Sequence, residues 1–369
     1  MRRKLFVFLI LVLYAGLVVG LFAGIKRFEQ GARQWYFTNV TRRMVSKVSK
    51  LGEDKCVLGV YRPELPYSFK NSAELEKGIG TRFTLISIYQ AWGEKDVHKF
   101  PTELMKAVDR KGCVPVLTWE PWVTDFTSEE LRPMPLREKG SLKDIAQGEY
   151  DFYIQQWARN AVKWGKPFFL RFAHEMSNPQ YPWTPQNGNT EEDYIRAWWH
   201  VRELFDSLGA DNVIWVWSPY KAQDVRFYPG DEYVDWVALD IFNYGELIAS
   251  GDHGRWRSFD QLLSPLYRSL EDIRKPVMIA EVGTTDMGGS REVWYREMFS
   301  QIASKFHKVK AVVFFDNPSD RTSGEWKIDW ALTDETEVLE EIRNSVENGC
   351  FTYVPDYSHQ LSDNKGVEK

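Results

Sequence analysis

Short apolar segments alternate with longer helix-like segments along most of the chain. Most of the apolar segments are uninterrupted, which is the pattern of parallel strands that are covered on both faces. They predict strands at Cys56–Tyr61, Phe83–Tyr89, Val114–Trp119, Phe168–His174, Val213–Trp217, Val234–Ile241, Val277–Glu281 and Ala311–Phe315. Helices are predicted between most of these strands, at Pro101–Arg110, Tyr150–Trp164, Glu191–Leu208, Phe259–Arg274, Glu292–Phe306 and finally Glu337–Asn348.

This alternation predicts an α/β fold, a (β/α)8 TIM barrel over residues 56–350. The fifth unit departs from the pattern, because the segment between Trp217 and Val234 leaves little room for a helix. A doubly wound open sheet is the alternative fold, but no G-x-G-x-x-G motif or P-loop follows an early strand. The sequence shows no internal repeat or second domain, and residues 351–369 read as a polar C-terminal tail.

At the N-terminus, an uninterrupted apolar run from Leu5 to Ile25 lies between basic residues. With a rise of about 1.5 Å per residue, a helix of this length spans roughly 30 Å, the thickness of a bilayer core. It predicts a transmembrane signal anchor over residues 1–25 and a basic stalk over residues 26–55, with the folded body outside the cytoplasm. A cleaved signal peptide and a secreted body are the alternative, although Leu21-Phe22-Ala23 is a poor cleavage site.

The composition and net charge of the chain limit the classes of partner that it can bind. Hydrophobic residues make up 43% and charged residues 27% of the chain, as in an ordinary globular protein. The net charge of −5 argues against a nucleic acid partner. The three cysteines lack C-x-x-C spacing, and we expect no metal, no cofactor and a monomer. Cys56 and Cys350 are expected at the N-terminal face of the barrel, where we predict that they can form a disulfide.

Most of the candidate functional side chains lie at the carboxyl ends of the predicted strands. In a TIM barrel these carboxyl-terminal ends meet at one rim and supply the reacting groups. The ends of predicted strands three to eight carry Trp119-Glu120-Pro121-Trp122, Arg171-Phe172-Ala173-His174-Glu175, Trp217-Ser218-Pro219-Tyr220, Asp240-Ile241-Phe242-Asn243-Tyr244, Glu281 and Asp316. Carboxylates and Trp side chains therefore converge on one rim.

Side-chain alternation suggests which carboxylates meet. Glu175 shares a strand face with Arg171, and Glu281 shares one with Ile279, because successive strand residues point to opposite faces. If both faces point inward, Glu175 and Glu281 approach each other across the barrel mouth. Two carboxyls about 5–5.5 Å apart are the arrangement of retaining glycoside hydrolysis. Burial of Glu175 among aromatic residues such as Trp183 is expected to raise its pKa, as a general acid requires.

The segment from Arg171 to Asn178, followed by Tyr181-Pro182-Trp183, resembles the acid/base motif of glycoside hydrolase family 26. The segment 228–240 resembles the family's entry into strand six, and Ala280-Glu281-Val282-Gly283 resembles its nucleophile segment. The family contains endo-β-1,4-mannanases, mixed-linkage β-glucanases and β-1,3-xylanases.

The resemblance implies that Glu175 is the acid/base and Glu281 the nucleophile, with Arg171 as a support residue. It also implies that His174 hydrogen-bonds near the acid and that Trp183 is a sugar platform. Further substrate contacts are expected from the residues that the strand ends deliver, which are Trp119, Glu120, Trp122, Trp217, Tyr220, Asp240 and Tyr244.

Two positions depart from the family pattern. Phe242 stands where the family commonly has a Tyr that hydrogen-bonds the nucleophile, and Tyr244 or Tyr220 are the candidate replacements. Glu120 stands where mannanase members often carry His, which favours glucan over mannan.

Together these features predict a membrane-anchored, retaining endo-β-glycanase that acts on β-1,4-mannan or mixed-linkage β-glucan by double displacement. A polysaccharide-binding barrel with weak or no activity is one alternative, because Phe242 lacks a hydroxyl. A transglycosylase that uses the same two Glu residues is another, and either would act in exopolysaccharide synthesis or export.

Overall fold

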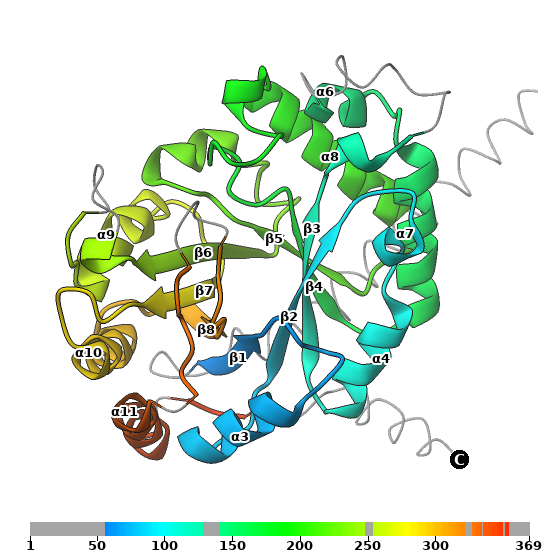
Figure 1. The fold of residues 1–369 in the computed structure, drawn as a ribbon. Coiled ribbons are helices and arrows are strands. Elements are labelled where there is room, and N and C mark those ends of the chain that lie inside the picture. The colour runs from blue at the N-terminus through cyan, green and yellow to red at the C-terminus, as the bar shows by residue number, and fades with distance from the viewer. Residues whose placement is uncertain are drawn as a thin grey trace, which may run out of the picture. The chain divides into compact units, whose positions relative to one another are not determined.

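Eight parallel strands close into a barrel in the computed structural model, in the order of the sequence (Figure 1). The structure describes residues 56–127, 141–247, 254–321, 327–333, 335–349 and 351–353. The strands are β1 (Val57–Tyr61), β2 (Leu85–Ala91), β3 (Val114–Glu120), β4 (Phe168–Phe172), β5 (Val213–Trp217), β6 (Trp236–Asn243), β7 (Val277–Thr284) and β8 (Val309–Phe315). The predicted TIM barrel is confirmed, and the open-sheet alternative is excluded because β1 pairs with β8.

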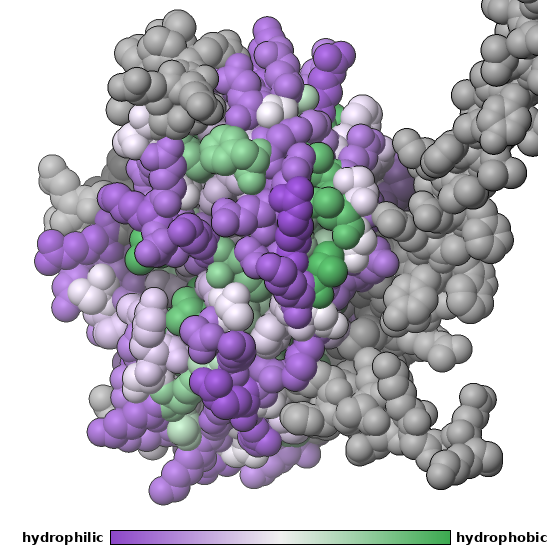
Figure 2. All heavy atoms as spheres, turned by 90° about the vertical axis from the view of Figure 1, so that its right-hand side faces the viewer, coloured by the Kyte–Doolittle hydropathy of each residue, from purple (hydrophilic) through white to green (hydrophobic). Residues whose placement is uncertain are grey.

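Helices surround the barrel in Figure 1. They are α3 (Lys70–Ile79), α4 (Thr102–Arg110), α6 (Ser141–Ala146), α7 (Asp151–Trp164), α8 (Glu191–Ser207), α9 (Phe259–Ser269), α10 (Arg291–Ser304) and α11 (Thr336–Glu347). Of these, α3 and α6 were not among the predicted helices. The fifth unit has only the 3-10 helix η5 (Ala222–Phe227) between β5 and β6, as the short segment between Trp217 and Val234 predicted. Seen from the right-hand side of Figure 1, the outer surface is mostly hydrophilic, with scattered apolar patches (Figure 2).

The strands are apolar on both faces because each face packs into a different core. The barrel interior holds a small cluster that includes Val116, Phe169 and Met278. The larger core lies between strands and helices and is strongly aromatic, with Trp119 stacked or tilted against Tyr153 and Trp157. Full burial of one such large side chain is worth about 1.5–3 kcal/mol.

A β-bulge in β7 determines where Glu281 points. Leu239 of β6 pairs with Ile279, but the next residue, Asp240, pairs with Glu281, so that Ala280 is the extra residue. Ile279 packs in the outer core and Ala280 in the barrel interior. The expectation that Ile279 and Glu281 share an inward face is therefore wrong. The bulge turns Glu281 toward the interior, which is a common use of bulges beside active sites.

Strand β4 ends earlier than the sequence predicted, at Phe172. Ala173 and Glu175 adopt positive φ values of 44° and 49°, in the left-handed region that costs a non-glycine residue about 1–3 kcal/mol. The predicted common strand face of Arg171 and Glu175 is therefore wrong, because the strand gives way to a turn after Phe172. Two backbone bonds fix this turn: Glu175 N–H donates to Ser218 O over 2.7 Å, and Asn178 N–H to Glu175 O over 2.8 Å.

Several predictions fall outside the described residues. These are the signal anchor (1–25), the stalk (26–55), Cys350 and most of the C-terminal tail. The predicted disulfide therefore stays a prediction, although Cys56 forms a parallel β-bridge with Phe351, the residue after Cys350. Within the described ranges, no helix is both long enough and apolar enough to cross a membrane.

Candidate active site

Arg171 is the centre of a charged network at the mouth of the barrel. Its side chain is fully buried on the interior face of β4, two residues beyond Phe169. Nη1 donates to both carboxylate oxygens of Asp240, over 2.7 and 2.8 Å, and Nε donates to Thr118 Oγ1 over 3.0 Å. Nη2 donates to Glu281 Oε1. One guanidinium thus fixes carboxylates from two neighbouring strands with the planar, multiple contacts that Arg favours.

Glu281 and Asp240 share this cation but differ in exposure. The Asp240 side chain is 2% exposed and the Glu281 side chain 10% exposed. Burial raises the pKa of Asp240 well above its ordinary value, with Arg171 opposing this shift and the charges of Glu281 and Glu175 adding to it. Arg171 engages one oxygen of Glu281 but both oxygens of Asp240, so the more exposed Glu281 keeps one oxygen that Arg171 does not bind.

Glu175 lies beside this network, in the turn after β4. Asn178 Nδ2 donates to Glu175 Oε2 over 2.6 Å. Burial, and then the negative charge of Glu281, raise the pKa of Glu175 to about 7, against the lowering effects of Asn178, Arg171 and Asp240. Near neutral pH, this carboxyl therefore holds a proton that it can deliver.

Aromatic side chains from the β4–α8 segment flank Glu175. Tyr181 Oη and His174 Nε2 lie 2.9 Å apart, and Tyr181 stacks on Trp183 with ring centroids 4.5 Å apart. Trp183 Nε1 donates to His174 O over 2.8 Å, and Trp122 packs edge-on against both Tyr181 and Trp183. Burial and the charge of Arg171 lower the pKa of His174 well below its ordinary value, so the imidazole is neutral.

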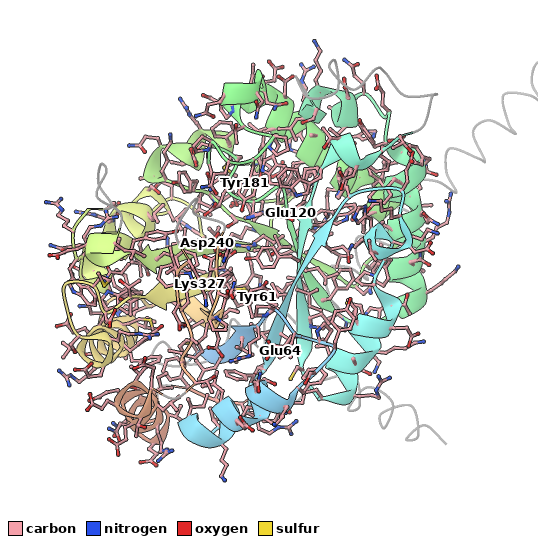
Figure 3. All side chains as sticks on the ribbon, in the orientation of Figure 1. Tyr61, Glu64, Glu120, Tyr181, Asp240 and Lys327 are labelled. Carbon is pink, nitrogen blue, oxygen red and sulfur yellow. The ribbon has the colours of Figure 1, made fainter. Side chains whose placement is uncertain are left out.

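Glu120 is a third carboxyl at this rim. It follows Val116 and Thr118 on the interior face of β3, and Trp122 Nε1 donates to its Oε2 over 3.2 Å. Burial raises the pKa of Glu120 to about 7, against the lowering effects of Trp122 and Arg171. Figure 3 shows Glu120, Tyr181, Asp240 and Tyr61 around the middle of the ring of strands.

Tyr61 and Tyr89 form a wall on the β1–β2 side. Their rings contact each other edge-on with centroids 5.0 Å apart, and Tyr61 stacks on Phe315 of β8 at 4.8 Å. Arg171 Nη2 lies 3.5 Å from Tyr89 Oη, so the cation that binds Glu281 also faces this wall. Burial raises the pKa of Tyr61 to about 12, and the charge of Glu281 adds to the shift.

The structure removes three Trp residues from the expected sugar contacts. Trp119 and Trp217 are 0% exposed and pack on the helix side of the strands, and Trp183 is 1% exposed under Tyr181. They are core residues, and the expectation that Trp183 is a sugar platform is corrected. Trp122 and Tyr181 stay partly exposed instead.

The remaining predicted residues divide between the two sides of the site. Tyr220 is partly exposed, and burial followed by the charge of Glu175 raises its pKa, which places it on the acid side. Phe242 and Tyr244 pack against Trp330, at ring-centroid distances of 4.9 and 5.3 Å.

The predicted site residues did not include Tyr61, Tyr89 or Tyr181. Tyr61 and Tyr89 end or nearly end their strands, as Glu120 does, so the same strand-end rule finds them. In the described ranges, no group of His, Cys, Asp and Glu side chains could hold a metal ion.

Comparisons with known proteins agree with this arrangement. The family model for glycosyl hydrolase family 26 matches residues 115–283, a segment that contains both Glu175 and Glu281. Endoglucanase H of Acetivibrio thermocellus is 31% identical over 252 residues, which cover 66% of this chain and 25% of the relative. A mannan endo-1,4-beta-mannosidase of Bacillus subtilis is 27% identical over 161 residues, covering 41% of this chain and 40% of the relative. The chain thus spans less than half the length of these curated relatives.

Solved structures support the same fold. A modular endo-beta-1,4-mannanase from Cellulomonas fimi superposes with a TM-score of 0.62 at 14% identity, covering 85% of this chain and 75% of that one. A beta-mannanase from Bacteroides ovatus gives a TM-score of 0.60 at 13% identity, covering 84% and 93%. The family match leads to one conclusion: residues 115–283, which contain both candidate carboxylates, belong to glycoside hydrolase family 26.

Proposed function

We propose that this protein is a retaining endo-β-glycanase that cleaves a β-linked polysaccharide by double displacement, with Glu175 as acid/base and Glu281 as nucleophile. The observation that carries the proposal is the contrast between two carboxyls at one rim. Glu175 has a pKa raised to about 7, while Glu281 pairs with Arg171. Such divergent surroundings are how a carboxyl pair divides the acid and nucleophile tasks.

In the first step, the protonated Glu175 gives its proton to the glycosidic oxygen while Glu281 attacks the anomeric carbon. The glycosyl–oxygen bond breaks, and a glycosyl–Glu281 ester forms. Arg171 orients Glu281 through Nη2 and leaves the second carboxylate oxygen for attack. Proton delivery of this kind is worth about 10²–10⁴-fold in rate.

In the second step, Glu175 acts as the base that takes a proton from the attacking water. The carbon–oxygen bond to Glu281 then breaks, and the sugar is released with its original anomeric configuration. Asn178 donates to Glu175, so it keeps this carboxyl in place in both protonation states.

The missing hydroxyl at Phe242 does not leave Glu281 without a donor, because Arg171 binds it directly. This favours an active enzyme over a decayed binding barrel. Phe242 instead packs in an aromatic group with Phe315 and Trp330.

For the substrate, we propose mixed-linkage or other β-1,4-linked glucan ahead of β-1,4-mannan. The relative with the longest matched segment described above is named an endoglucanase, and the mannosidase matches a shorter segment. Glu120, near the rim and with a pKa raised to about 7, has one oxygen engaged by Trp122 and is suited to hydrogen-bond a sugar hydroxyl. The apolar run at residues 5–25 supports a body that is exported and held at a membrane.

The direct test is hydrolysis of a panel of β-glucans, mannans and xylans by the full chain, with products followed by proton NMR. We expect one class to be cleaved internally, with the β-anomer appearing first. Initial release of the α-anomer contradicts retention. Binding without turnover favours the binding protein, and products longer than the substrate favour the transglycosylase.

A further inference from the structure

The turn that carries Glu175 depends on support from outside its own segment. Ala173 and Glu175 both have positive φ values, and neither residue is a glycine. Such conformations persist only where the surrounding structure holds them in place. Asn178 N–H closes the turn by donating to Glu175 O, and further support comes from neighbouring segments of the barrel.

The segment that follows β5 supplies much of that support. Ser218 O accepts a hydrogen bond from Glu175 N–H over 2.7 Å. Asp224, in η5, accepts a hydrogen bond from Ser177 Oγ, also over 2.7 Å. Both contacts join the β5–β6 segment to the β4–α8 segment. The acid's turn is therefore held at the backbone of Glu175 and again two residues further on.

Asp224 is a buried carboxylate that joins several parts of this region. It is 0% exposed, and its Oδ2 atom accepts three hydrogen bonds: from Ser177 Oγ, from Tyr220 N–H over 3.0 Å and from Lys221 N–H over 3.1 Å. Hydrogen bonds to a carboxylate are roughly twice as strong as those between neutral groups. One oxygen thus connects the turn of the acid to the backbone that follows β5.

Two tyrosines place Asp224 close to the turn from other directions. Tyr194 Oη donates to Ala173 O over 3.2 Å, and burial followed by the charge of Asp224 raises the pKa of Tyr194. Tyr220, whose N–H binds Asp224, has a pKa raised by burial and then by the charges of Glu175 and Asp224. Asp224 therefore lies among the groups that surround the acid.

Capping of η5 is the other task of Asp224. Its carboxylate accepts from the N–H of Lys221, the residue before η5, and its own N–H donates to Lys221 O over 3.0 Å. A cap of this kind stabilises the fold and has no part in proton delivery. The bond from Ser177 adds nothing to the cap, because it reaches Asp224 from the β4–α8 segment. This bond is what links η5 to the acid.

We propose that Asp224 is a positioning residue for the acid/base, which fixes, through Ser177, the left-handed turn that aims the Glu175 carboxyl at the glycosidic oxygen. The proposal rests on the proposed function, which makes Glu175 the proton donor. It gives the short fifth unit of the barrel a role in catalysis, because η5 holds Asp224 against the β4–α8 segment.

The test measures kcat/KM of Ser177→Ala on the cleaved polysaccharide and on an aryl glycoside of the same sugar with a good leaving group. This variant removes the link to the turn and leaves the η5 cap in place. On the polysaccharide, kcat/KM should fall about 10–100-fold, because a misplaced acid delivers its proton poorly. On the aryl glycoside it should stay close to the wild-type value, since this leaving group departs without protonation.

Asp224→Asn and Asp224→Ala provide a second comparison. Among the described residues, Asp224 Oδ1 has no hydrogen-bond partner, so the amide nitrogen of Asn can take its place while the amide oxygen keeps the Oδ2 position. Asp224→Asn should therefore retain more activity on the polysaccharide than Asp224→Ala.

Ser264→Ala is the matched control. Ser264 Oγ also donates to a carboxylate over 2.7 Å, that of Asp260, but both residues belong to α9. The loss of this bond should leave kcat/KM on both substrates unchanged.

Two results refute the positioning role: wild-type kcat/KM of Ser177→Ala on the polysaccharide, or an equal loss on the two substrates. Absence of turnover by the wild type refutes the hydrolase instead, and an NMR titration of the Glu175 carboxyl in the full chain then decides the positioning role. We expect the pKa of Glu175 to be lower in Ser177→Ala than in the wild type, because a loosened turn is less buried. An unchanged pKa refutes the role of Asp224.

Discussion

The turn after β4 and the bulge in β7 each deliver one glutamate to the same rim, but they surround it differently. Glu175 sits in a left-handed turn beside Tyr181 and receives one hydrogen bond from a neutral amide. Glu281 sits on a bulge and receives a charged hydrogen bond from Arg171. The amide leaves the proton on Glu175 near neutral pH, whereas the guanidinium compensates the charge of Glu281.

This difference explains why Arg171 binds Asp240 and Glu281 and makes no direct hydrogen bond with Glu175 among the described residues. A cation paired directly with the acid would lower the pKa of that acid. Direct pairing with Arg171 thus separates the two tasks, because Glu281 has it and Glu175 does not. Each prediction below changes one side of that contrast.

The largest effect is expected from Glu281→Ala. Loss of the nucleophile should lower kcat on the order of 10⁵-fold, because no covalent intermediate can form. Turnover of the identified polysaccharide measures this, with circular dichroism as the check on folding. A folded variant with wild-type turnover contradicts the assignment.

Glu175→Gln should lower kcat by roughly 10²–10⁴-fold on a natural polysaccharide. The loss should shrink on an aryl glycoside with a good leaving group, since such a group departs without protonation. Steady-state rates on the two substrate types make the comparison. An equal loss on both would show that Glu175 is not the proton donor.

Arg171→Met should destabilise the fold by about 3–5 kcal/mol, because it leaves buried carboxylates without their cation. Arg226→Met is the matched control. The Arg226–Glu191 ion pair is exposed, at 3.0 Å, and such pairs are worth only about 0–1 kcal/mol. Urea unfolding measures both. Equal costs would mean that Arg171 is not the support that Glu281 and Asp240 require.

The pH dependence gives the smallest and most specific effect. Glu175 must be protonated to act as the acid, and its pKa is raised from 4.5 to about 7, so activity should fall about tenfold per unit above pH 7. The same shift means that the folded protein holds this proton between pH 4.5 and 7. Its stabilising contribution is therefore present at low pH and lost as the pH rises through 7.

The Glu120→Gln variant shows which of two carboxyls causes the loss of activity at high pH, because the pKa values of Glu120 and Glu175 are both raised to about 7. The alkaline limb should persist in this variant, and it should vanish in Glu175→Gln assayed on an aryl glycoside. If the alkaline limb of the pH profile disappears only in Glu120→Gln, Glu120 is the general acid instead.

Much of the fold could be predicted because parallel strands covered on both faces are continuous apolar runs, and β5 matches its predicted bounds. The same property hides which side of a strand faces inward. Trp119 and Glu120 are neighbours, yet one packs under the helices and the other faces the mouth. When both faces of a strand are apolar, the alternation of side chains does not show which face points inward. Trp119 and Trp217, at strand ends, were therefore expected in the cleft although they lie in the outer core.

Both candidate catalytic glutamates could be placed at the rim from the strand-end rule and the family resemblance. The backbone conformations that bring the two glutamates to the rim could not be predicted. The extra residue Ala280 and the left-handed φ of Ala173 and Glu175 have no local sequence mark such as glycine. They depend on tertiary contacts, including the Arg171 bond to Glu281 and the Ser218 carbonyl that binds Glu175 N–H.

The central claim is that Glu281 forms the covalent bond while Glu175 moves the proton. The most direct measurement is trapping with a 2-fluoro glycoside of the sugar that the enzyme cleaves, followed by peptide mass spectrometry. The 2-fluoro group slows both steps, and a good leaving group lets the glycosyl-enzyme accumulate. We predict one label per chain, on the peptide that contains Glu281 and absent from Glu281→Ala. A label on Glu175, or turnover with no glycosyl-enzyme and inverted product, would contradict it.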